Sequence, residues 1–339
     1  MGNSTKIDII DAKILKVLLD ESRTSFTDIA DECKITVGAV RMRYKRLWKE
    51  GIINGEVTLV NPHCLGYRHI VDLEIAIDPV NEKQVSAFLE SKPHISQVVV
   101  SNSGSFLGKV VLRDLNKLSR IVEELESNHQ IKHVEALIWA EAVNVEFPQN
   151  LVIKPLTHDN SRKTVRPTPT DLDRKPIEMD EIDRKIAVIL SRKSRTPFRK
   201  IAEQLDISTK TVIQRYKKLR EKIFTRSTIT LDLNKLGFKA LANLYIKVTN
   251  RSKMNEIYMQ LLQVPNLTVI IRLVGHYDLY AAIFLEDFDS LFKTRELIGK
   301  IDGIENPLEL LIPTPPSWPF NLFPSLLENE SMPKHWTGN

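Results

Sequence analysis

The sequence predicts an α+β protein in which one two-domain unit occurs twice. A helix-forming stretch with a positive face, Thr36 to Asn54, is repeated in part at Ser208 to Leu219, shifted by 172 positions. After each copy, segments with strand and helix periodicity follow one another in the order βαββαβ. A proline-rich stretch without periodicity separates the two copies. These three observations fix the expected class and the expected duplication.

Length and composition describe a globular chain with room for several hydrophobic cores. The 339 residues are 42% hydrophobic and 27% charged. The formal net charge is +5 and the sequence pI is about 9.0, which favours a polyanionic partner. The first residues contain no apolar signal core and no apolar run reaches membrane-spanning length, so we expect a cytoplasmic protein with no membrane partner. Cys33 and Cys64 stand singly, which indicates neither a disulfide scaffold nor a zinc site. We expect no metal and no other cofactor.

The first expected domain, residues 1–61, opens with three helices. Asp8 is a good N-cap for a helix to Leu19, and a short helix follows over Phe26 to Asp31. The third helix starts after the N-cap Thr36 and ends at Gly51, which can adopt the left-handed conformation. Its apolar residues at helical spacing, which should face inward, are Val40, Tyr44 and Leu47.

A hairpin, or wing, is expected from Ile52 to Val60. Asn54-Gly55 should form its tip, because Asn-Gly is the strongest two-residue hairpin signal. Three helices followed by such a hairpin make a winged helix-turn-helix, in which the third helix enters a DNA groove. The side chains expected on the DNA-facing side of this helix are Val37, Gly38, Arg41, Met42, Arg43, Lys45 and Arg46.

The second half repeats this organisation in residues 179–233. Asp180 and Asp183 match Asp8 and Asp11, and Ser194-Arg195-Thr196 matches Ser22-Arg23-Thr24. One residue is missing where the third helix ends, so this copy has neither the glycine nor the Asn-Gly pair. The side chains expected to face DNA in this copy are Thr209, Lys210, Gln214, Arg215, Lys217 and Lys218.

Two βαββαβ domains are expected, at residues 67–147 and 238–313, and this order defines the ferredoxin-like fold. Residues 154–178, with four prolines and few apolar side chains, should form an extended linker. Residues 314–339 form a tail rich in proline and aromatic residues. We expect Trp318, Phe320, Leu322 and Phe323 to pack over a core edge or a neighbouring subunit.

The motifs together resemble the Lrp/AsnC family of transcriptional regulators. The residues that carry the resemblance read D-x-x-D-x-K-I-L-x-x-L, then R-T-x-x-x-x-I-A, then K-x-G-I-I and an L-G-Y connection. The resemblance covers nearly the whole chain, twice. It implies a winged helix-turn-helix and a dimerising ferredoxin-like domain in each unit. It also implies double-stranded DNA as partner, a homodimer or higher oligomer formed through the ferredoxin-like domains, and an amino acid or similar small metabolite as effector.

The second copy contains Gly275-His276-Tyr277-Asp278, which is similar to the family's turn at the effector pocket. The first copy has Gly104-Ser105-Phe106 there and lacks the Tyr-Asp pair. The resemblance therefore implies an effector site in the second copy, with the four residues from Gly275 to Asp278 as candidates. The alternative is that Gly275 and Asp278 only shape a tight hairpin.

Two other functions remain open at this point. Siroheme decarboxylases resemble the same family and contain a W-P-Y/F-N-L-F motif, which Trp318 to Phe323 matches. Here, however, the hexapeptide follows the last expected strand instead of lying within the βαββαβ domain, and only Arg272 offers a cation for a substrate with several carboxylates. A non-specific architectural DNA-binding protein is the third alternative, which the net charge permits. We favour a sequence-specific regulator that is not an enzyme.

Overall fold

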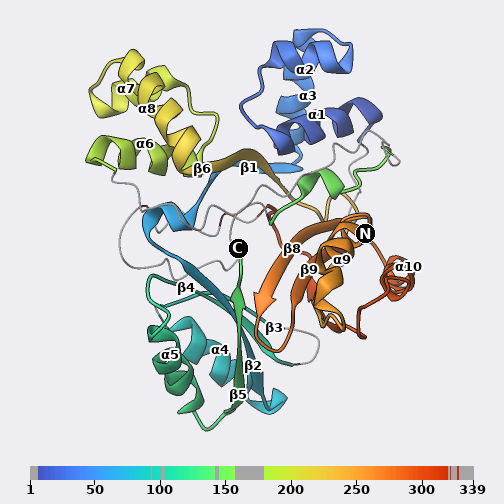
Figure 1. Ribbon diagram of the computed structural model, residues 1–339. Helices are drawn as coiled ribbons and strands as arrows, with labels where there is room; N and C mark the ends of the chain where they lie inside the picture. Colours follow the sequence, from blue (N-terminus) through green and yellow to red (C-terminus); the bar gives the residue numbers. More distant parts are fainter. Residues whose placement is uncertain are drawn as a thin grey trace.

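The computed structural model describes residues 7–92, 94–100, 104–141, 145–156, 179–319, 321 and 327. The expected linker lies outside these residues except for its first three positions, and so does most of the expected tail. Two helical heads lie at one end of the molecule and two sheet domains at the other (Figure 1). In the part of the chain that is described, no helix is both long and apolar enough to cross a membrane.

Each head consists of three helices. The first head contains α1 (Ile9–Asp20), α2 (Phe26–Cys33) and α3 (Val37–Lys49). The second contains α6 (Glu181–Arg192), α7 (Phe198–Leu205) and α8 (Thr209–Lys222). As the sequence predicts, Asp8 caps α1 in a capping box with Asp11, Thr36 caps α3, and Gly51 has a φ of +67°.

The predicted wing hairpin is wrong. Residues Ile53–Val60 form one strand, β1, which pairs antiparallel with β6 (Phe224–Leu231) of the second copy. Asn54-Gly55 lies inside that strand, where the ladder is irregular. A Cβ at Gly55 would lie 2.4 Å from Oγ1 of Thr230, so the glycine permits close strand approach and does not form a turn. The eight residues of β1 are too few for two strands and a turn, so the partner strand must come from elsewhere.

The two strands, which we call the β1–β6 ribbon, are exchanged between the heads. Strand β6 packs on α1, and its Ile229 and Leu231 belong to the core of the first head. Strand β1 packs on α6, and its Val60 belongs to the core of the second head. The strand that follows one head therefore completes the core of the other head.

Both βαββαβ domains have the expected element order. The first comprises β2 (His69–Ile77), α4 (Glu82–Glu90), β3 (Ile95–Val100), β4 (Phe106–Leu112), α5 (Lys117–Glu126) and β5 (Ile131–Trp139). The second comprises β7 (Ala240–Ile246), α9 (Met254–Leu261), β8 (Leu267–Val274), β9 (Leu279–Leu285), α10 (Phe288–Gly299) and β10 (Leu308–Pro313). Their strand orders, β5-β2-β4-β3 and β10-β7-β9-β8, are equivalent, which confirms the duplicated ferredoxin-like fold.

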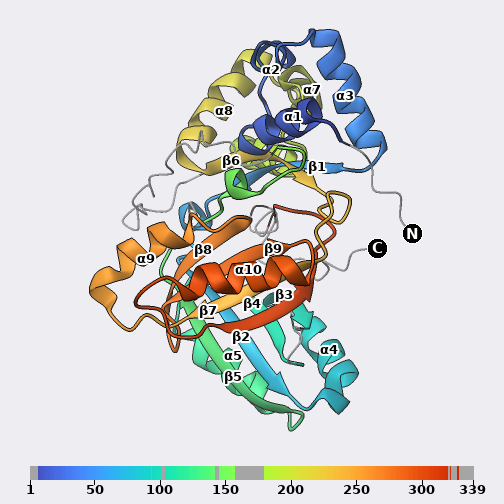
Figure 2. The same ribbon diagram turned by 90° about the vertical axis from the view of Figure 1, so that its right-hand side faces the viewer.

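The two sheet domains pair within one chain. Strands β5 and β8 join them through Ile138 opposite Val274 and Trp139 opposite Leu273. Each sheet uses its two faces differently, because successive side chains alternate. On β2, for example, Val71 and Leu73 pack with the helices of their own domain, whereas Ile70 packs with residues of the second sheet. In Figure 2, α9 and α10 lie on the outer side of the second sheet.

The described start of the tail packs against this assembly. Trp318 is completely buried and exchanges backbone hydrogen bonds with Leu231 at 2.7 and 3.0 Å. Its ring meets the Phe284 ring edge-on at 5.3 Å. Trp318 thus packs as expected, while Phe320, Leu322 and Phe323 lie outside the described residues.

Candidate nucleic-acid interface

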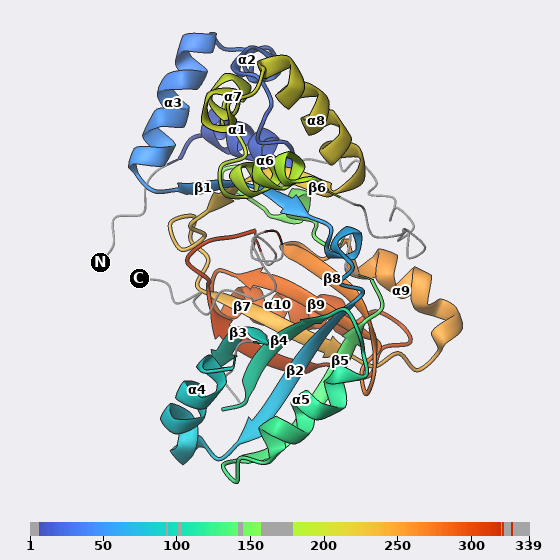
Figure 3. The ribbon, with the colours of Figure 1, turned by 90° about the vertical axis from the view of Figure 1, so that its left-hand side faces the viewer.

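The recognition helices α3 and α8 lie on the surface of the head pair. In Figures 2 and 3 they slope away from the top of the molecule on opposite flanks. Their inner faces are buried, with Val40 and Leu47 in α3 and Val212 and Leu219 in α8 at most 1% exposed. Each helix therefore presents a long outer face that the fold leaves open.

Tyr44 connects the inner side of α3 to the ribbon. Its hydroxyl donates a hydrogen bond of 3.0 Å to Glu56 of β1. Burial raises the pKa of Tyr44 to about 12, so the hydroxyl stays protonated and can keep donating at neutral pH. This contact orients α3 relative to the strand that enters the neighbouring head.

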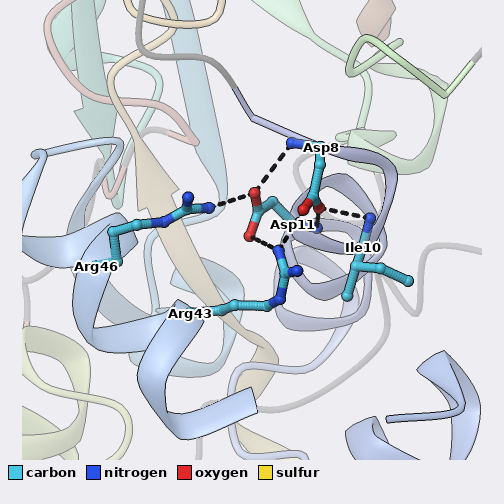
Figure 4. Close-up of polar contacts among 5 residues, drawn as sticks. All are labelled: Asp8, Ile10, Asp11, Arg43 and Arg46. Atoms are coloured by element: carbon cyan, nitrogen blue, oxygen red, sulfur yellow. Dashed lines mark hydrogen bonds and ion pairs between the residues drawn. The ribbon is translucent and has the colours of Figure 1, made fainter. Parts of the chain in front are cut away.

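Two of the arginines predicted to contact DNA form ion pairs with the first helix instead. Arg43 donates to Asp8 at 2.6 Å and to Asp11 at 2.8 Å. Arg46 pairs with the other oxygen of Asp11, whose side chain is completely buried (Figure 4). A buried carboxylate needs such partners, because an unpaired charge inside a protein is costly.

The second head has the same arrangement. Arg215 contacts Asp180 and, at 2.9 Å, Asp183, and Lys218 donates to Asp183 at 2.8 Å. The hydrogen bond from Arg215 lowers the pKa of Asp180. Asp8 and Asp180 are therefore both N-cap residues and partners of the recognition helix. DNA contacts by these four cations remain a prediction, but the structure gives each of them an intramolecular partner.

The other predicted residues lie on the exposed outer faces. In α3 these are Val37, Gly38, Arg41, Met42 and Lys45, and in α8 they are Thr209, Lys210, Gln214 and Lys217. Met42 is 67% exposed, which places a large apolar side chain in the middle of this face. Sequence reasoning missed Ile213, which is exposed and occupies the position of Arg41 in the repeat. Applying the 172-residue shift of the repeat to Arg41 would have identified Ile213.

The repeated Ser-Arg-Thr segments join the heads. The hydroxyls of Ser22 and Ser194 hydrogen-bond at 2.7 Å. Arg23 donates to the backbone carbonyl of Ser194, and Arg195 donates to that of Ser22. We call this exchange the reciprocal arginine contact.

Aromatic rings extend the reciprocal arginine contact into both heads. The Arg23 guanidinium lies 4.3 Å from the centroid of the Phe198 ring, and that of Arg195 lies 4.8 Å from the Phe26 ring. Burial lowers the pKa of Arg23, but an arginine stays charged at neutral pH. Together with the β1–β6 ribbon, these contacts hold α3 and α8 in a fixed relative position.

The candidate effector turn in the second copy packs against the first sheet domain. A Cβ at Gly275 would lie 3.2 Å from the carbonyl oxygen of Ala136 in β5. The Asp278 carboxylate accepts a hydrogen bond from the amide of Val248 and pairs with Arg251 at 2.9 Å. His276 is exposed, and its ring meets that of Tyr277 edge-on at 4.8 Å. Gly275 and Asp278 thus have structural contacts, and effector binding at this turn stays a prediction.

Comparison with known proteins identifies a helix-turn-helix domain in each head. A model of a winged helix-turn-helix DNA-binding domain matches residues 7–54, and a model of the AsnC-type helix-turn-helix domain matches residues 179–220. The HTH-type transcriptional regulator Ptr1 of Methanocaldococcus jannaschii is 36% identical over 120 residues, which are 35% of this chain and 80% of Ptr1. The chain belongs to the Lrp/AsnC family.

This Lrp/AsnC chain is longer than the regulators it matches. The HTH-type transcriptional regulator FL11 of Pyrococcus horikoshii is 29% identical over 137 residues, which are 90% of FL11 but only 40% of this chain. Such a match corresponds in length to one of the two units described above. The chain is thus a DNA-binding transcriptional regulator of the Lrp/AsnC type in tandem-duplicated form.

A solved structure shares the fold of both units. The siroheme decarboxylase NirDL superposes with a TM-score of 0.58 and 15% identity, covering 89% of this Lrp/AsnC chain and 90% of NirDL. At this identity the likeness concerns the fold alone. A two-unit architecture of this kind therefore also occurs in a protein described as an enzyme, so function has to be argued from the heads.

Proposed function

We propose that one chain of this Lrp/AsnC protein binds double-stranded DNA with both heads, one on each of two half-sites. The observation that carries this proposal is the exchange of β1 and β6 between the heads. It makes the two recognition helices parts of one body, as two subunits would be in a dimer. Half-sites should then be spaced by one helical turn, about 34 Å, or a multiple of it.

The two helices should read different half-sites. Lys45 and Lys217 are equivalent in the repeat and exposed, which suits phosphate contacts that are common to both heads. The neighbouring positions differ, with Arg41 and Met42 in α3 against Ile213 and Gln214 in α8. Arginine suits a guanine edge and glutamine an adenine edge, so we expect an asymmetric operator.

Association between chains is proposed through the sheet domains. Strands β10 and β3 stand at the two ends of the eight-stranded sheet in the described part of the chain. On α10, Phe288 and Phe292 are 75% and 61% exposed. We also keep an amino-acid effector as a prediction. Within the turn, the carboxylate of Asp278 already has partners in the chain, Val248 and Arg251.

The test is selection of genomic DNA fragments by the full chain at two salt concentrations. Enrichment of one asymmetric site is expected. Lys45→Ala with Lys217→Ala should reduce the slope of log affinity against log salt by about 1.8, because each lost phosphate contact contributes about 0.9. Lys83→Ala with Lys117→Ala removes the same charge from α4 and α5, far from the heads, and should leave the slope unchanged (Figure 1).

Two results would replace the proposal. Salt-dependent binding without enrichment of a site would favour an architectural protein. Absence of DNA binding at low salt, together with a spectral change on adding iron-uroporphyrin III, would favour an enzyme of the NirDL kind. Such a porphyrin is the type of molecule named for a second NirDL structure, which has the same fold likeness.

A further inference from the structure

A cavity of about 140 Å³ lies between the facing sides of the two sheets and the β1–β6 ribbon. Aromatic and aliphatic side chains from both domains form most of its wall. They include Leu107, Trp139, Tyr245, Ile271, Phe284 and Trp318. An apolar cavity of about 150 Å³ accommodates a benzene molecule, so this space is suited to about one ring or a short branched chain.

Two polar groups in the wall lack hydrogen-bond partners. The Nη1 atom of Arg226 and the hydroxyl of Thr268 are buried, and neither has a partner among the described residues. Thr268 is completely buried. Buried donors are nearly always satisfied in native proteins, so two unsatisfied donors that line one cavity indicate a missing acceptor.

Several other polar groups of the wall pair with one another. Asp72 pairs with Lys109 and accepts from the indole of Trp139 at 2.8 Å. Tyr280 donates to Asn243 at 2.6 Å. Among the described residues that line the cavity, the buried side-chain atoms without a hydrogen-bond partner are Nη1 of Arg226 and the hydroxyl of Thr268.

The charge balance at this end of the cavity favours an anion. Arg226 of β6 faces Glu146, which pairs with Val269 of β8 in an isolated bridge next to Thr268. Burial raises the pKa of Glu146 to about 7, although the charge of Arg226 opposes the shift. Because Asp72 and Lys109 neutralise each other, the cavity is increasingly positive as the pH falls below 7.

We propose that this cavity binds a small apolar monocarboxylate, with its carboxylate on Arg226 and Thr268 and its hydrocarbon part among the aromatic side chains. An acid ligand supplies the acceptor that the two donors lack, and the wall supplies the apolar contacts. A ligand with several carboxylates is disfavoured, because Lys109, the other cation lining the described cavity, is already paired with Asp72. The proposal does not depend on DNA binding.

Glu146 gives the ligand site a pH signature. Burial raises the pKa values of Tyr245 and Tyr280, so they stay neutral, and Asp72 and Lys109 form an ion pair. Of the three lining groups whose pKa burial raises, Glu146 is the one with a pKa of about 7. Because the carboxyl of Glu146 has to be protonated beside the bound anion, the affinity for the carboxylate ligand should fall about tenfold from pH 6 to pH 8.

The experiment is titration of the full chain with benzoate at pH 6. Binding is measured by calorimetry and by tryptophan fluorescence, because Trp139 and Trp318 line the cavity. Benzamide has nearly the same shape without the charge, and it should bind at least about tenfold more weakly. Arg226→Met should weaken benzoate binding at least about tenfold, while Arg120→Met on the exposed surface of α5 should not. Glu146→Gln should bind benzoate with little dependence on pH.

Equal affinity for benzamide and benzoate would overturn the proposal, and this comparison needs no variant to fold. Undiminished benzoate binding by a folded Arg226→Met would also overturn it. So would tight binding of iron-uroporphyrin III without any binding of benzoate. Because no DNA is present, failure here leaves the proposed DNA recognition untouched.

Discussion

At the scale of single residues, charge alone does not identify a DNA-contacting side chain. Arg43 and Lys45 both lie on α3 and both suit a DNA surface by type. Arg43, however, is 25% exposed and pairs with Asp8 and the fully buried Asp11, whereas Lys45 is exposed. We therefore propose that Arg43 orients the recognition helix and that Lys45 contacts DNA.

This assignment predicts different consequences for two substitutions. Arg43→Ala should lower the free energy of unfolding by about 1–3 kcal/mol, because Asp11 loses one of two charged partners. It should weaken DNA binding with no change in salt slope. Lys45→Ala should leave stability unchanged and reduce the slope by about 0.9. Urea unfolding and binding at several salt concentrations measure both quantities, and a smaller salt slope for a stably folded Arg43→Ala would return Arg43 to the DNA interface.

At the scale of elements, the decisive feature is the exchange of strands between the heads. A strand of eight residues with an apolar inner side cannot satisfy its backbone groups alone. Its partner, β6, begins 171 positions later in the chain, and the same pairing buries Ile229 and Leu231 under α1. Stability of each head thus depends on residues of the other unit.

The exchange can be tested by core truncation in the ribbon. Ile229→Ala in β6 should cost about 2–5 kcal/mol and reduce amide-exchange protection first in α1, although Ile229 follows the second head in sequence. Val60→Ala in β1 is the reciprocal variant and should affect α6 first. Loss of protection in the head that each strand follows in sequence, and not in the opposite head, would contradict the exchanged arrangement.

At the scale of the whole molecule, duplication makes the head spacing a property of one chain. The β1–β6 ribbon and the reciprocal arginine contact fix the heads, so the separation of half-sites should be narrowly defined. Inserting about five base pairs, half a helical turn, between the selected half-sites should reduce affinity to that of one half-site, because the second site then faces away.

Titration of the operator by the chain gives the stoichiometry for the same test. One chain per pair of half-sites is expected at saturation. A single half-site on its own is the control and should bind as weakly as the lengthened operator. Tolerance of the insertion would mean that the heads separate, contrary to the fixed arrangement.

The cavity joins the two halves at this scale as well. It is lined by Arg226 and Leu59 of the ribbon and by side chains of both sheets. A ligand bound there would contact the strands that complete the cores of the heads.

Much of the fold could be predicted from local sequence. The caps at Asp8 and Thr36, the helix end at Gly51 and the alternation along His69–Ile77 follow from contacts within a few residues. The prediction of a wing hairpin was wrong, because Asn-Gly forms a hairpin only when strands flank it on both sides. The side chains free to contact DNA could be predicted only in part. Helical periodicity places both Arg43 and Lys45 on the surface, but it does not show that Arg43 pairs with Asp11.

The sequence by itself determined the family, the duplication and the order of elements, because these depend on short-range periodicity and on a repeat that is visible in the chain. Only the tertiary structure decided which strand completes which head, which cations are already paired, and that two sheets enclose a cavity with unsatisfied donors. The strand exchange and the cavity depend on residues more than 100 positions apart, such as Ser22 and Ser194 or Glu146 and Val269. The ion pair of Arg43 with Asp11 joins two helices of one head. No local pattern specifies these contacts, because they arise only when separate elements, and for the strand exchange and the cavity both copies, pack together.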